Sequence, residues 1–410
     1  MLSIVLATKV SLLNNGMTTE KNGIIASGLS KSSIFARMED RRLHIISFDN
    51  PYPPVYGGVL DVFFKVRALH KIGFEIYLHC FVDSDRGADD ELKKLVKEVH
   101  FYRRNKRKSA LKLLSPYPFA VHSRYSKDLV ANLEKVKAPI LFEGQHTTFV
   151  TTLHEFPNRK MVLRLHNLEA NYYLGQSRSE TNHIKKTAYF SEYLKYTFFQ
   201  KDIAKFDAVL ALSRFEFESA KQYNKNMFYI PVFHGNETVA NLSEFGKYAF
   251  YHGDLRLADN RRAARFLIKA FKKIPDYNLL IASGNDGGLT SLIADVPNVS
   301  FVSFENHDEL AKLLEDAHIN VMLSFQESGT KLKLVNALYN SRFCVINKNM
   351  IDDHSVRELC TMAETEQDFV NAVNDLKDKP YADTSRRQKV LDAVLNDVEN
   401  ARKIEAVFCR

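Results

Sequence analysis

The sequence predicts an α/β protein built from two tandem doubly wound domains that face each other across a cleft. Three observations lead to this prediction. The chain has 410 residues, which is too long for one compact core. Short apolar runs alternate with amphipathic helical stretches, the pattern of a parallel sheet covered by helices on both faces. A segment rich in Pro, Gly, Asn and Ser at 231–246 interrupts this alternation, which then starts again.

Six apolar runs in the first half of the chain predict strands. Each run is continuously apolar, as expected for strands of a parallel sheet that are buried on both faces. Helical patterns separate most of the runs, beginning with a helix over 59–71 that follows the first one. The runs cover 43–48, 74–81, 98–102, 139–144, 161–166 and 208–213.

A second set of strands and helices follows the break at 231–246. The final stretch, 386–408, predicts one long charged amphipathic helix. We therefore divide the chain into an N-terminal domain over 42–235, a C-terminal domain over 247–385 and a C-terminal helix over 386–410. Strands of the second domain are expected at 247–253, 278–283, 299–303, 319–324 and 342–347, with helices at 260–273, 307–317 and 330–340.

Residues 1–41 are interpreted as an N-terminal extension that does not fold. Residues 1–37 are rich in Ser, Asn, Gly and Thr, and organised sequence begins only after Met38. Met38 would be the start codon if the extension is not translated. The apolar stretch near the start lacks preceding basic residues and a small-residue cleavage site, so we do not assign a signal peptide.

Composition restricts the class of protein. Hydrophobic residues make up 45% and charged residues 26% of the chain, which is ordinary for a globular protein in water. No apolar run reaches the roughly 18 residues of a membrane span. The four cysteines are scattered and form no CxxC pair, which argues for a reducing compartment and against a disulfide framework or a thiolate metal site. A cytoplasmic location is the expectation.

Basic residues are concentrated in one short segment. The formal net charge is +8, and five of the six residues at 103–108 are basic. This segment is either a solvated loop after a strand or a patch that meets anionic lipid headgroups at the inner face of the plasma membrane. Binding of nucleic acid is not expected, because no recognition motif accompanies the patch.

The segment 325–339 has an unusual distribution of charge. It follows an apolar run and places Lys331 and Lys333 in the first turn of a predicted helix. Gly329 allows the backbone to approach a ligand, and Thr330 is expected to cap the helix. Lysines at a helix start oppose the helix dipole, whereas the free N–H groups there attract anions. Solubilising lysines on an exposed face are the alternative, but the strand and the glycine favour contact with a phosphate.

Helical spacing divides the rest of this segment into two faces. Asn336 lies on the same face as Lys333 and Ala337. This face is expected to point toward the ends of the strands. The residues expected to pack on the sheet are Leu332, Val335, Leu338 and Tyr339.

Two further strand ends in the second half carry glycines. One strand ends at Gly253, and a short loop leads to Asn260 and a helix. Another ends in a glycine-rich turn in which Ser283 and Gly284 could line the same cleft. Neither has the spacing of a GxGxxG fingerprint, and no GxxxxGK[ST] motif occurs, so a dinucleotide fingerprint and a P-loop are not supported.

The first half offers two strand-end positions. Gly57 and Gly58 start the first predicted helix and could either serve a substrate hydroxyl or phosphate or form a tight turn. His166 and Asn167 follow another strand. A lone histidine at a strand end is most often a satisfied polar residue, but this one is expected at the cleft between the domains, which favours contact with substrate.

Together these motifs resemble those of bacterial GT-B glycosyltransferases, which have two Rossmann-like domains. The group most similar is the glycosyltransferase family 4-like enzymes often labelled mannosyltransferases. The resemblance covers residues 42–405, and its last helix matches the one that crosses back to the N-terminal domain. The order and spacing of four motifs carry it: YPPVYGG, LRLHN, YHGDL with a following DN, and SGTKLKLVNAL.

The resemblance implies a nucleotide-sugar donor in the C-terminal domain and an acceptor in the N-terminal domain. It places Gly253, Asp254, Lys331 and Lys333 near the donor diphosphate and His166 near the transferred sugar. The catalytic residues are then His166, Lys331 and Lys333; the donor-binding residues Gly253, Asp254, Asn260, Ser283, Gly284, Gly329, Thr330 and Asn336; and the acceptor-binding residues Gly57, Gly58 and Asn167.

One position departs from the family. Members usually carry a glutamate that bonds the ribose, where this chain has the neutral Asn336. The function expected from the resemblance is a retaining glycosyltransferase that needs no metal or other cofactor. It would act on a saccharide or lipid-linked acceptor in the synthesis of a surface polysaccharide. A sugar-nucleotide epimerase on the same fold and a non-catalytic nucleotide-sugar-binding protein are the alternatives.

Overall fold

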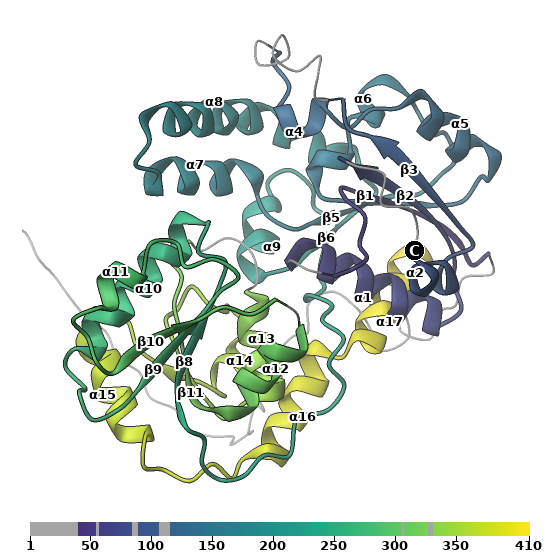
Figure 1. Cartoon of the computed structure of the whole chain (residues 1–410). Helices are drawn as coiled ribbons and strands as arrows, with labels where there is room; N and C mark the ends of the chain where they lie inside the picture. The colour runs from purple at the N-terminus through teal and green to yellow at the C-terminus, as the bar shows by residue number, and fades with distance from the viewer. Residues whose placement is uncertain (1–39, 55–56, 84–88, 106–114, 306, 327–330) are drawn as a thin grey trace, which may run out of the picture.

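The computed structural model describes residues 40–54, 57–83, 89–105, 115–305, 307–326 and 331–410. These residues form two parallel sheets with helices on both faces of each (Figure 1). The first sheet has seven strands in the order β3-β2-β1-β4-β5-β6-β7, and the second has six in the order β10-β9-β8-β11-β12-β13. The predicted fold class, two tandem doubly wound α/β domains, is confirmed.

The first sheet contains the six predicted strands and one that was not predicted. Its centre is β1, whose Ile45 is in register with Leu78 of β2 and Leu141 of β4. The extra strand, β7, is a three-residue edge strand, too short to give a pattern of its own. The strands are β1 (Arg42–Ser47), β2 (Glu75–Val82), β3 (Glu98–Arg103), β4 (Ile140–Glu143), β5 (Met161–Leu165), β6 (Ala208–Ala211) and β7 (Met227–Tyr229).

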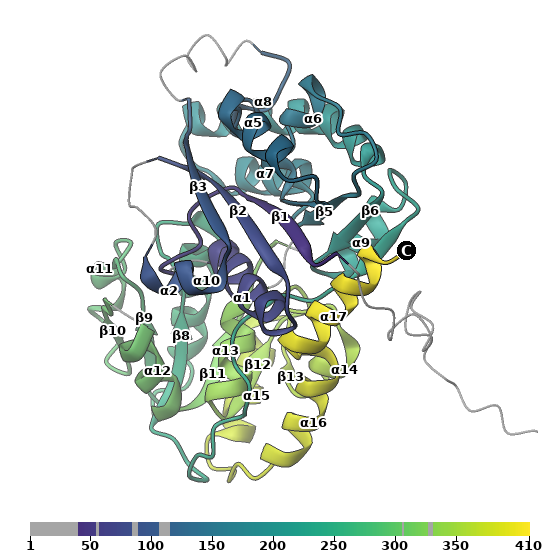
Figure 2. The same ribbon diagram turned by 90° about the vertical axis from the view of Figure 1, so that its right-hand side faces the viewer.

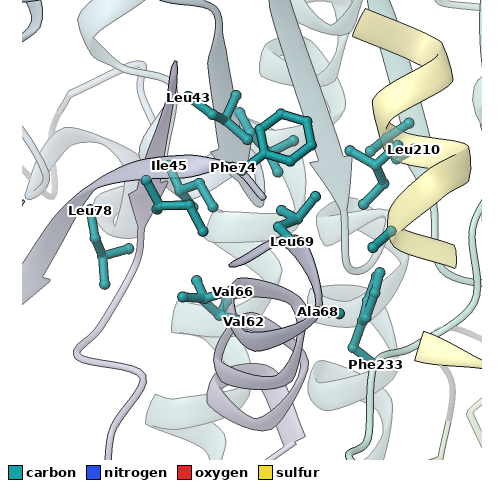
Figure 3. Close-up of a cluster of buried hydrophobic side chains, with 14 of the residues drawn as sticks. Leu43, Ile45, Val62, Val66, Ala68, Leu69, Phe74, Leu78, Leu210 and Phe233 are labelled. Atoms are coloured by element: carbon teal, nitrogen blue, oxygen red, sulfur yellow. The ribbon is translucent and has the colours of Figure 1, made fainter. Parts of the chain in front are cut away.

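Helices cover this sheet, and α1 supplies the centre of its core. Val62, Val66 and Leu69 of α1 recur at helical spacing and pack against Ile45 and Leu78 of the strands (Figure 3). The helices are α1 (Gly57–Lys71), α2 (Asp90–Leu95), α4 (Phe119–His122), α5 (Lys127–Lys135), α6 (Val150–Leu153), α7 (Glu169–Ser179), α8 (His183–Phe199) and α9 (Arg214–Ala220), with 3-10 turns η2 (Gln145–Thr147) and η3 (Gln200–Lys205).

The second sheet repeats the arrangement with shorter strands. Its strands are β8 (Tyr248–His252), β9 (Leu279–Ala282), β10 (Val299–Val302), β11 (Ala317–Met322), β12 (Phe343–Ile346) and β13 (Thr361–Met362). Its helices are α10 (Ala258–Phe271), α11 (Thr290–Ile293), α12 (His307–Asp316), α13 (Leu332–Asn340), α14 (His354–Arg357) and α15 (Glu366–Leu376).

The C-terminal segment forms two helices, so the prediction of one helix over 386–408 is wrong. α16 (Thr384–Leu395) ends before Asn396, and α17 (Asp397–Phe408) begins after it. Asn396 is extended, and its side chain accepts a hydrogen bond from the Glu399 amide, as an N-cap residue does. The amphipathic pattern continues across this position, but Asn396 ends one helix and caps the next.

This break lets the chain cross from one domain to the other. Leu391 and Leu395 of α16 are buried in the core of the second domain, whereas Ile404 and Val407 of α17 are buried in that of the first. Figure 2 shows α17 beside α1 and α16 beside the second sheet.

The crossing is tied to the earlier connection between the domains. The carboxylate of Asp397 accepts hydrogen bonds from the His234 amide at 3.2 Å and the Gly235 amide at 2.8 Å. The two segments that connect the domains therefore contact each other at Asp397.

Among the residues described, no helix has both the length and the apolar composition that crossing a bilayer requires.

Candidate active site

Two adjoining hollows lie between the domains. The larger, here called the C-terminal hollow, has a volume of about 680 Å³. The smaller, the N-terminal hollow, has about 510 Å³. Gly57 at the start of α1 and Leu332 at the start of α13 line both hollows, so the two meet where the domains face each other. Most of their other lining residues follow the carboxyl ends of strands, where doubly wound sheets bind ligands.

The hollows bring together many of the predicted residues. The C-terminal hollow is lined by Gly253, Asp254, Gly284, Lys333 and Asn336, and the N-terminal hollow by Gly58, His166 and Asn167, with Gly57 in both. Gly329 and Thr330 lie outside the described residues, and Lys331, Asn260 and Ser283 do not line either hollow.

Lys333 is held inside the C-terminal hollow by its neighbours. Its Nζ lies 3.4 Å from Oδ1 of Asn260 and 4.7 Å from the ring centroid of Tyr251. Burial lowers the pKa of Lys333 to about 8, which the nearby Asp259 carboxylate opposes and Lys331 reinforces. A cation that has lost most of its hydration in an open hollow is available to bind an anion.

The start of α13 differs from the expectation. The N-cap position is Lys331, whose side chain makes no capping bond, and the helix begins at Leu332. Thr330, the predicted cap, lies outside the described residues. Lys331 is half-buried, and burial lowers its pKa. The Leu334 amide in the first turn of α13 already donates to the Lys331 carbonyl at 2.9 Å.

The predicted faces of α13 are partly wrong. Leu332, expected on the sheet, lines both hollows, and Ala337, expected toward the hollow, is fully buried in the core. Leu334, which was not assigned to either face, is also buried. Leu332 is the first residue of the helix, which explains why it lies between the two hollows and not on the sheet.

Asn260 organises the loop after β8. Its Nδ2 donates to the Asp254 carbonyl at 3.0 Å, and a Cβ at Gly253 would lie 3.0 Å from its Cγ. Gly253 is therefore needed for close packing against Asn260. Asn260 supports both the loop and Lys333, which is a positioning role. The Asp254 carboxylate bonds Arg256 at 2.8 Å, and this hydrogen bond lowers the pKa of Asp254.

Ser283 and Asn336 have different surroundings. Ser283 is buried, and its hydroxyl accepts from the amides of Leu255 and Asn285, so it joins two loops of the hollow. Oδ1 of Asn336 accepts from Nδ2 of Asn236 at 3.2 Å. Asn336 thus links the hollow to the connection between the domains.

His166 is fixed by a carboxylate. It follows β5, and its Nε2 lies 2.9 Å from Oε2 of Glu143. Its ring meets that of Phe48 edge-on. With Nε2 engaged, Nδ1 is the nitrogen that remains for a molecule in the N-terminal hollow.

A buried charge cluster, absent from the predictions, lies behind His166. Asp61, Lys65, Glu143 and Arg164 all have side chains with no solvent exposure. Lys65 Nζ lies 2.8 Å from both Asp61 Oδ2 and Glu143 Oε2, and Arg164 Nη2 lies 2.9 Å from Asp61 Oδ1. Burial alone would raise the pKa of both carboxyls, but the cations beside them hold both pKa values below the usual range.

The sequence did contain a signal for this cluster. Asp61 and Lys65 stand four residues apart inside the apolar pattern of α1, and Glu143 and Arg164 interrupt apolar strands. Charged residues at such positions are almost never buried without partners.

The ligand atoms of Asp61, Glu143 and His166 lie within 4.8 Å of one another, the spacing of a metal site. Lys65 already bonds both carboxylates, and Arg164 supplies a second positive charge. A metal ion would have to displace the Lys65 ammonium, so these residues do not fit a metal site. Their arrangement instead holds His166 in place.

The N-terminal hollow also contains a protonated carboxyl that was not predicted. Glu169, at the start of α7, is buried and lies 3.5 Å from Nδ1 of His146. Burial raises the pKa of Glu169 to about 8, although the charge of Arg124 opposes the shift. At neutral pH its carboxyl is mostly neutral and can donate a hydrogen bond to a ligand.

Replacing Glu169 by glutamine is expected to change how stability depends on pH. In the fold Glu169 keeps its proton up to about pH 8, whereas its ordinary pKa is 4.5. The free energy that the buried, protonated Glu169 contributes to stability is fully present below pH 4.5 and is lost as the pH rises to about 8. Urea unfolding should therefore show wild type losing on the order of 2–4 kcal/mol relative to Glu169→Gln between pH 4.5 and 8.5. If the free energy of unfolding depends on pH in the same way for wild type and Glu169→Gln, then Glu169 does not keep its proton in the fold.

The predicted basic segment 103–108 is only partly described. Arg103 and Arg104 are placed, whereas the three basic residues at 106–108 lie outside the described residues. Arg104 pairs with Asp83 at 3.2 Å and lines the N-terminal hollow. Arg104 therefore faces the hollow and not the outer surface of this segment.

Comparison with known proteins agrees with this geometry. Residues 246–379, which hold most of the C-terminal hollow, match the family described as "Glycosyl transferases group 1". A curated relative is the "Uncharacterized 44.6 kDa protein in cps region" of Klebsiella pneumoniae. It is 24% identical over 326 residues, which cover 74% of this chain and 82% of that protein.

Solved structures match both domains together. Sucrose-phosphate synthase from Thermosynechococcus elongatus has a TM-score of 0.64 at 17% identity, over 89% of this chain and 97% of that one. HepE from Anabaena in complex with UDP has a TM-score of 0.61 at 12% identity, over 88% and 98%. TarM from S. aureus, in complex with fondaparinux, α-GlcNAc-glycerol and UDP, has a TM-score of 0.58 at 11% identity, over 90% and 99%. These likenesses support the two-domain fold over the part of the chain that they cover.

Proposed function

We propose that this GT-B protein, whose residues 246–379 form a group 1 glycosyltransferase domain, moves a hexose from a nucleotide-sugar donor to a saccharide or lipid-linked acceptor. The observation that carries the proposal is the desolvated Lys333 at the start of α13, inside a hollow formed by strand-end loops. The cps-region relative supports a role in surface polysaccharide synthesis. The HepE complex with UDP-glucose supports a nucleotide-sugar donor.

The donor diphosphate binds in the C-terminal hollow in this proposal. Breaking the bond between sugar and phosphate builds negative charge on the departing diphosphate. Lys333 and the positive end of the α13 helix dipole are fixed before the reaction and stabilise that charge where it develops. Gly253 and Gly284 line the same hollow and let the backbone come close to the nucleotide.

The acceptor occupies the N-terminal hollow. His166, anchored by Glu143, and the neutral carboxyl of Glu169 can hydrogen-bond sugar hydroxyls there. Gly57 and Leu332 line both hollows, so the transferred sugar lies between donor and acceptor at this junction. Closing the domains would exclude water, so that the acceptor attacks in place of water.

We further propose that the reaction retains the anomeric configuration and needs no divalent metal. Retention rests on the family resemblance. Independence of metal is supported by Lys65, which already bonds both carboxylates of the candidate ligand group, and by Lys333, which supplies positive charge to the leaving group.

Release of free nucleotide from a panel of nucleotide sugars tests the proposal. We expect the purified protein to release nucleotide from at least one donor at a rate that a chelator does not change. Turnover that stops with chelator would contradict the metal-free mechanism. If no donor is turned over and no nucleotide raises the melting temperature, the donor site is wrong; binding without turnover would identify a non-catalytic binding protein.

A further inference from the structure

Exposed apolar side chains gather on one helix, α8. Ile184 is 83% exposed, Phe198 68%, Phe190 46% and Leu194 45%. At 100° per residue these four positions fall within an arc of about 120° on the helix surface. Single exposed hydrophobic residues are ordinary, but a contiguous stripe marks an interaction surface.

The opposite face of α8 packs on the protein. Tyr196 and Phe199 are buried in a small core with Val121 and Phe149, and the Tyr196 ring stacks on that of Tyr173 of α7 at 5.3 Å. Figure 1 shows α8 as the outer helix of the α7–α8 pair. The stripe therefore points away from the first domain.

The charge around the stripe is positive. Between 178 and 201 there are five Lys or Arg residues and two Glu, a net charge of +3. Lys186 is exposed and lies about 40° from one edge of the stripe, at 100° per residue. Glu192, the acid within α8, is half-buried and accepts hydrogen bonds from the Phe119 amide and from Lys195. The apolar stripe of α8 thus lies in a segment of net positive charge, with the exposed Lys186 near one edge, which complements an anionic partner.

We propose that this face of α8 docks on an anionic lipid bilayer. A helix that lies in the membrane interface needs an apolar stripe, basic residues beside it and too little hydrophobicity to span the bilayer, and α8 has all three. Tyr189 and Tyr193, both half-buried, add the amphipathic rings that are enriched at membrane interfaces. At 17 residues the helix is about 25 Å long, long enough for several side chains to enter the headgroups together.

The position of α8 gives this docking a consequence for the reaction. The helix packs on α7, whose Glu169, Tyr172 and Tyr173 line the N-terminal hollow. Docking through α8 would hold the acceptor hollow one helix layer from the bilayer surface. This consequence rests on the proposed function, in which that hollow takes the acceptor, and it favours a lipid-linked acceptor over a free saccharide.

Co-sedimentation with vesicles tests the docking directly and does not depend on turnover. Vesicles of equal parts phosphatidylglycerol and phosphatidylcholine should bind the full-length protein, and pure phosphatidylcholine vesicles should bind it weakly. The double variant Ile184→Gln/Phe198→Gln should lower the partition coefficient by at least about tenfold, because both side chains are exposed and would enter the interface. Binding by wild type should also weaken as salt rises.

The matched control is Leu292→Gln/Met362→Gln, which replaces two exposed apolar residues of the second domain. This variant should bind vesicles as wild type does, and circular dichroism should show both variants folded. Equal vesicle binding by wild type and the α8 variant, or none by wild type, would overturn the proposal. So would a wild-type dimer in analytical ultracentrifugation that the α8 variant abolishes, since the face would then join two copies. Without vesicles, both variants should release nucleotide at the same rate. Loss of vesicle binding with unchanged nucleotide release is therefore an effect on docking and not on the proposed transfer reaction.

Discussion

Replacing Lys333 by alanine is expected to lower kcat for sugar transfer by about 10²–10³-fold. The lysine stands at the start of α13 in the C-terminal hollow, where burial lowers its pKa to about 8. A cation that is already desolvated and fixed stabilises the departing diphosphate without reorganisation. Initial rates with the best donor from the nucleotide-release panel measure the effect.

The control is Lys269→Ala, which removes an exposed lysine from α10 of the same domain and should leave the rate unchanged. The free protein should also bind donor more weakly as the pH rises above about 8, because Lys333 then loses its proton and its charge. A Lys333→Ala variant that keeps wild-type kcat would contradict the role of this residue.

Replacing Asp61 by alanine is expected to destabilise the protein by about 3–5 kcal/mol. The Asp61 carboxylate bonds Arg164 at 2.9 Å and Lys65 at 2.8 Å, and it accepts from the Phe233 amide at 2.8 Å. All three side chains are fully buried, so the variant leaves charge without a partner in the core. Urea unfolding at neutral pH measures the change in the free energy of unfolding.

A neutral replacement separates charge from volume. Asp61→Asn keeps the size of the side chain but removes its charge, and it should cost nearly as much as the alanine variant. Glu155→Ala, an exposed position in the same domain, should change stability by less than about 0.5 kcal/mol. If replacing Asp61 lowers the free energy of unfolding no more than replacing Glu155 does, then the buried cluster does not hold the first domain together.

Much of the fold could be predicted because a parallel sheet buries both faces of its strands. Continuous apolar runs such as 43–48 and 208–213 identified strands with ends displaced by one or two residues. β7 and β13 were missed because three or two residues give no period. The break at Asn396 was missed because the helical pattern continues across it, and an asparagine inside a helix is a weak signal.

The candidate site was only partly predictable. Residues such as Gly253 and His166 were chosen because they follow strands, and the carboxyl ends of parallel strands meet at one edge of the sheet. The buried cluster was missed because its partners are far apart in sequence. Lys65 meets Glu143 across 78 residues, and Asp61 meets Arg164 across 103. Spacing cannot show that Ser283 faces a neighbouring loop, since this depends on tertiary packing.

The most direct test of the proposed diphosphate site compares two ligands by isothermal titration calorimetry. A nucleoside diphosphate and its parent nucleoside, with the base of the best donor, are titrated into wild type and Lys333→Ala. We predict that the variant binds the diphosphate at least about tenfold more weakly, because a charged hydrogen bond is lost, and binds the nucleoside as wild type does. If Lys333→Ala binds both ligands more weakly by the same factor, or binds both as wild type does, then Lys333 does not hold the diphosphate.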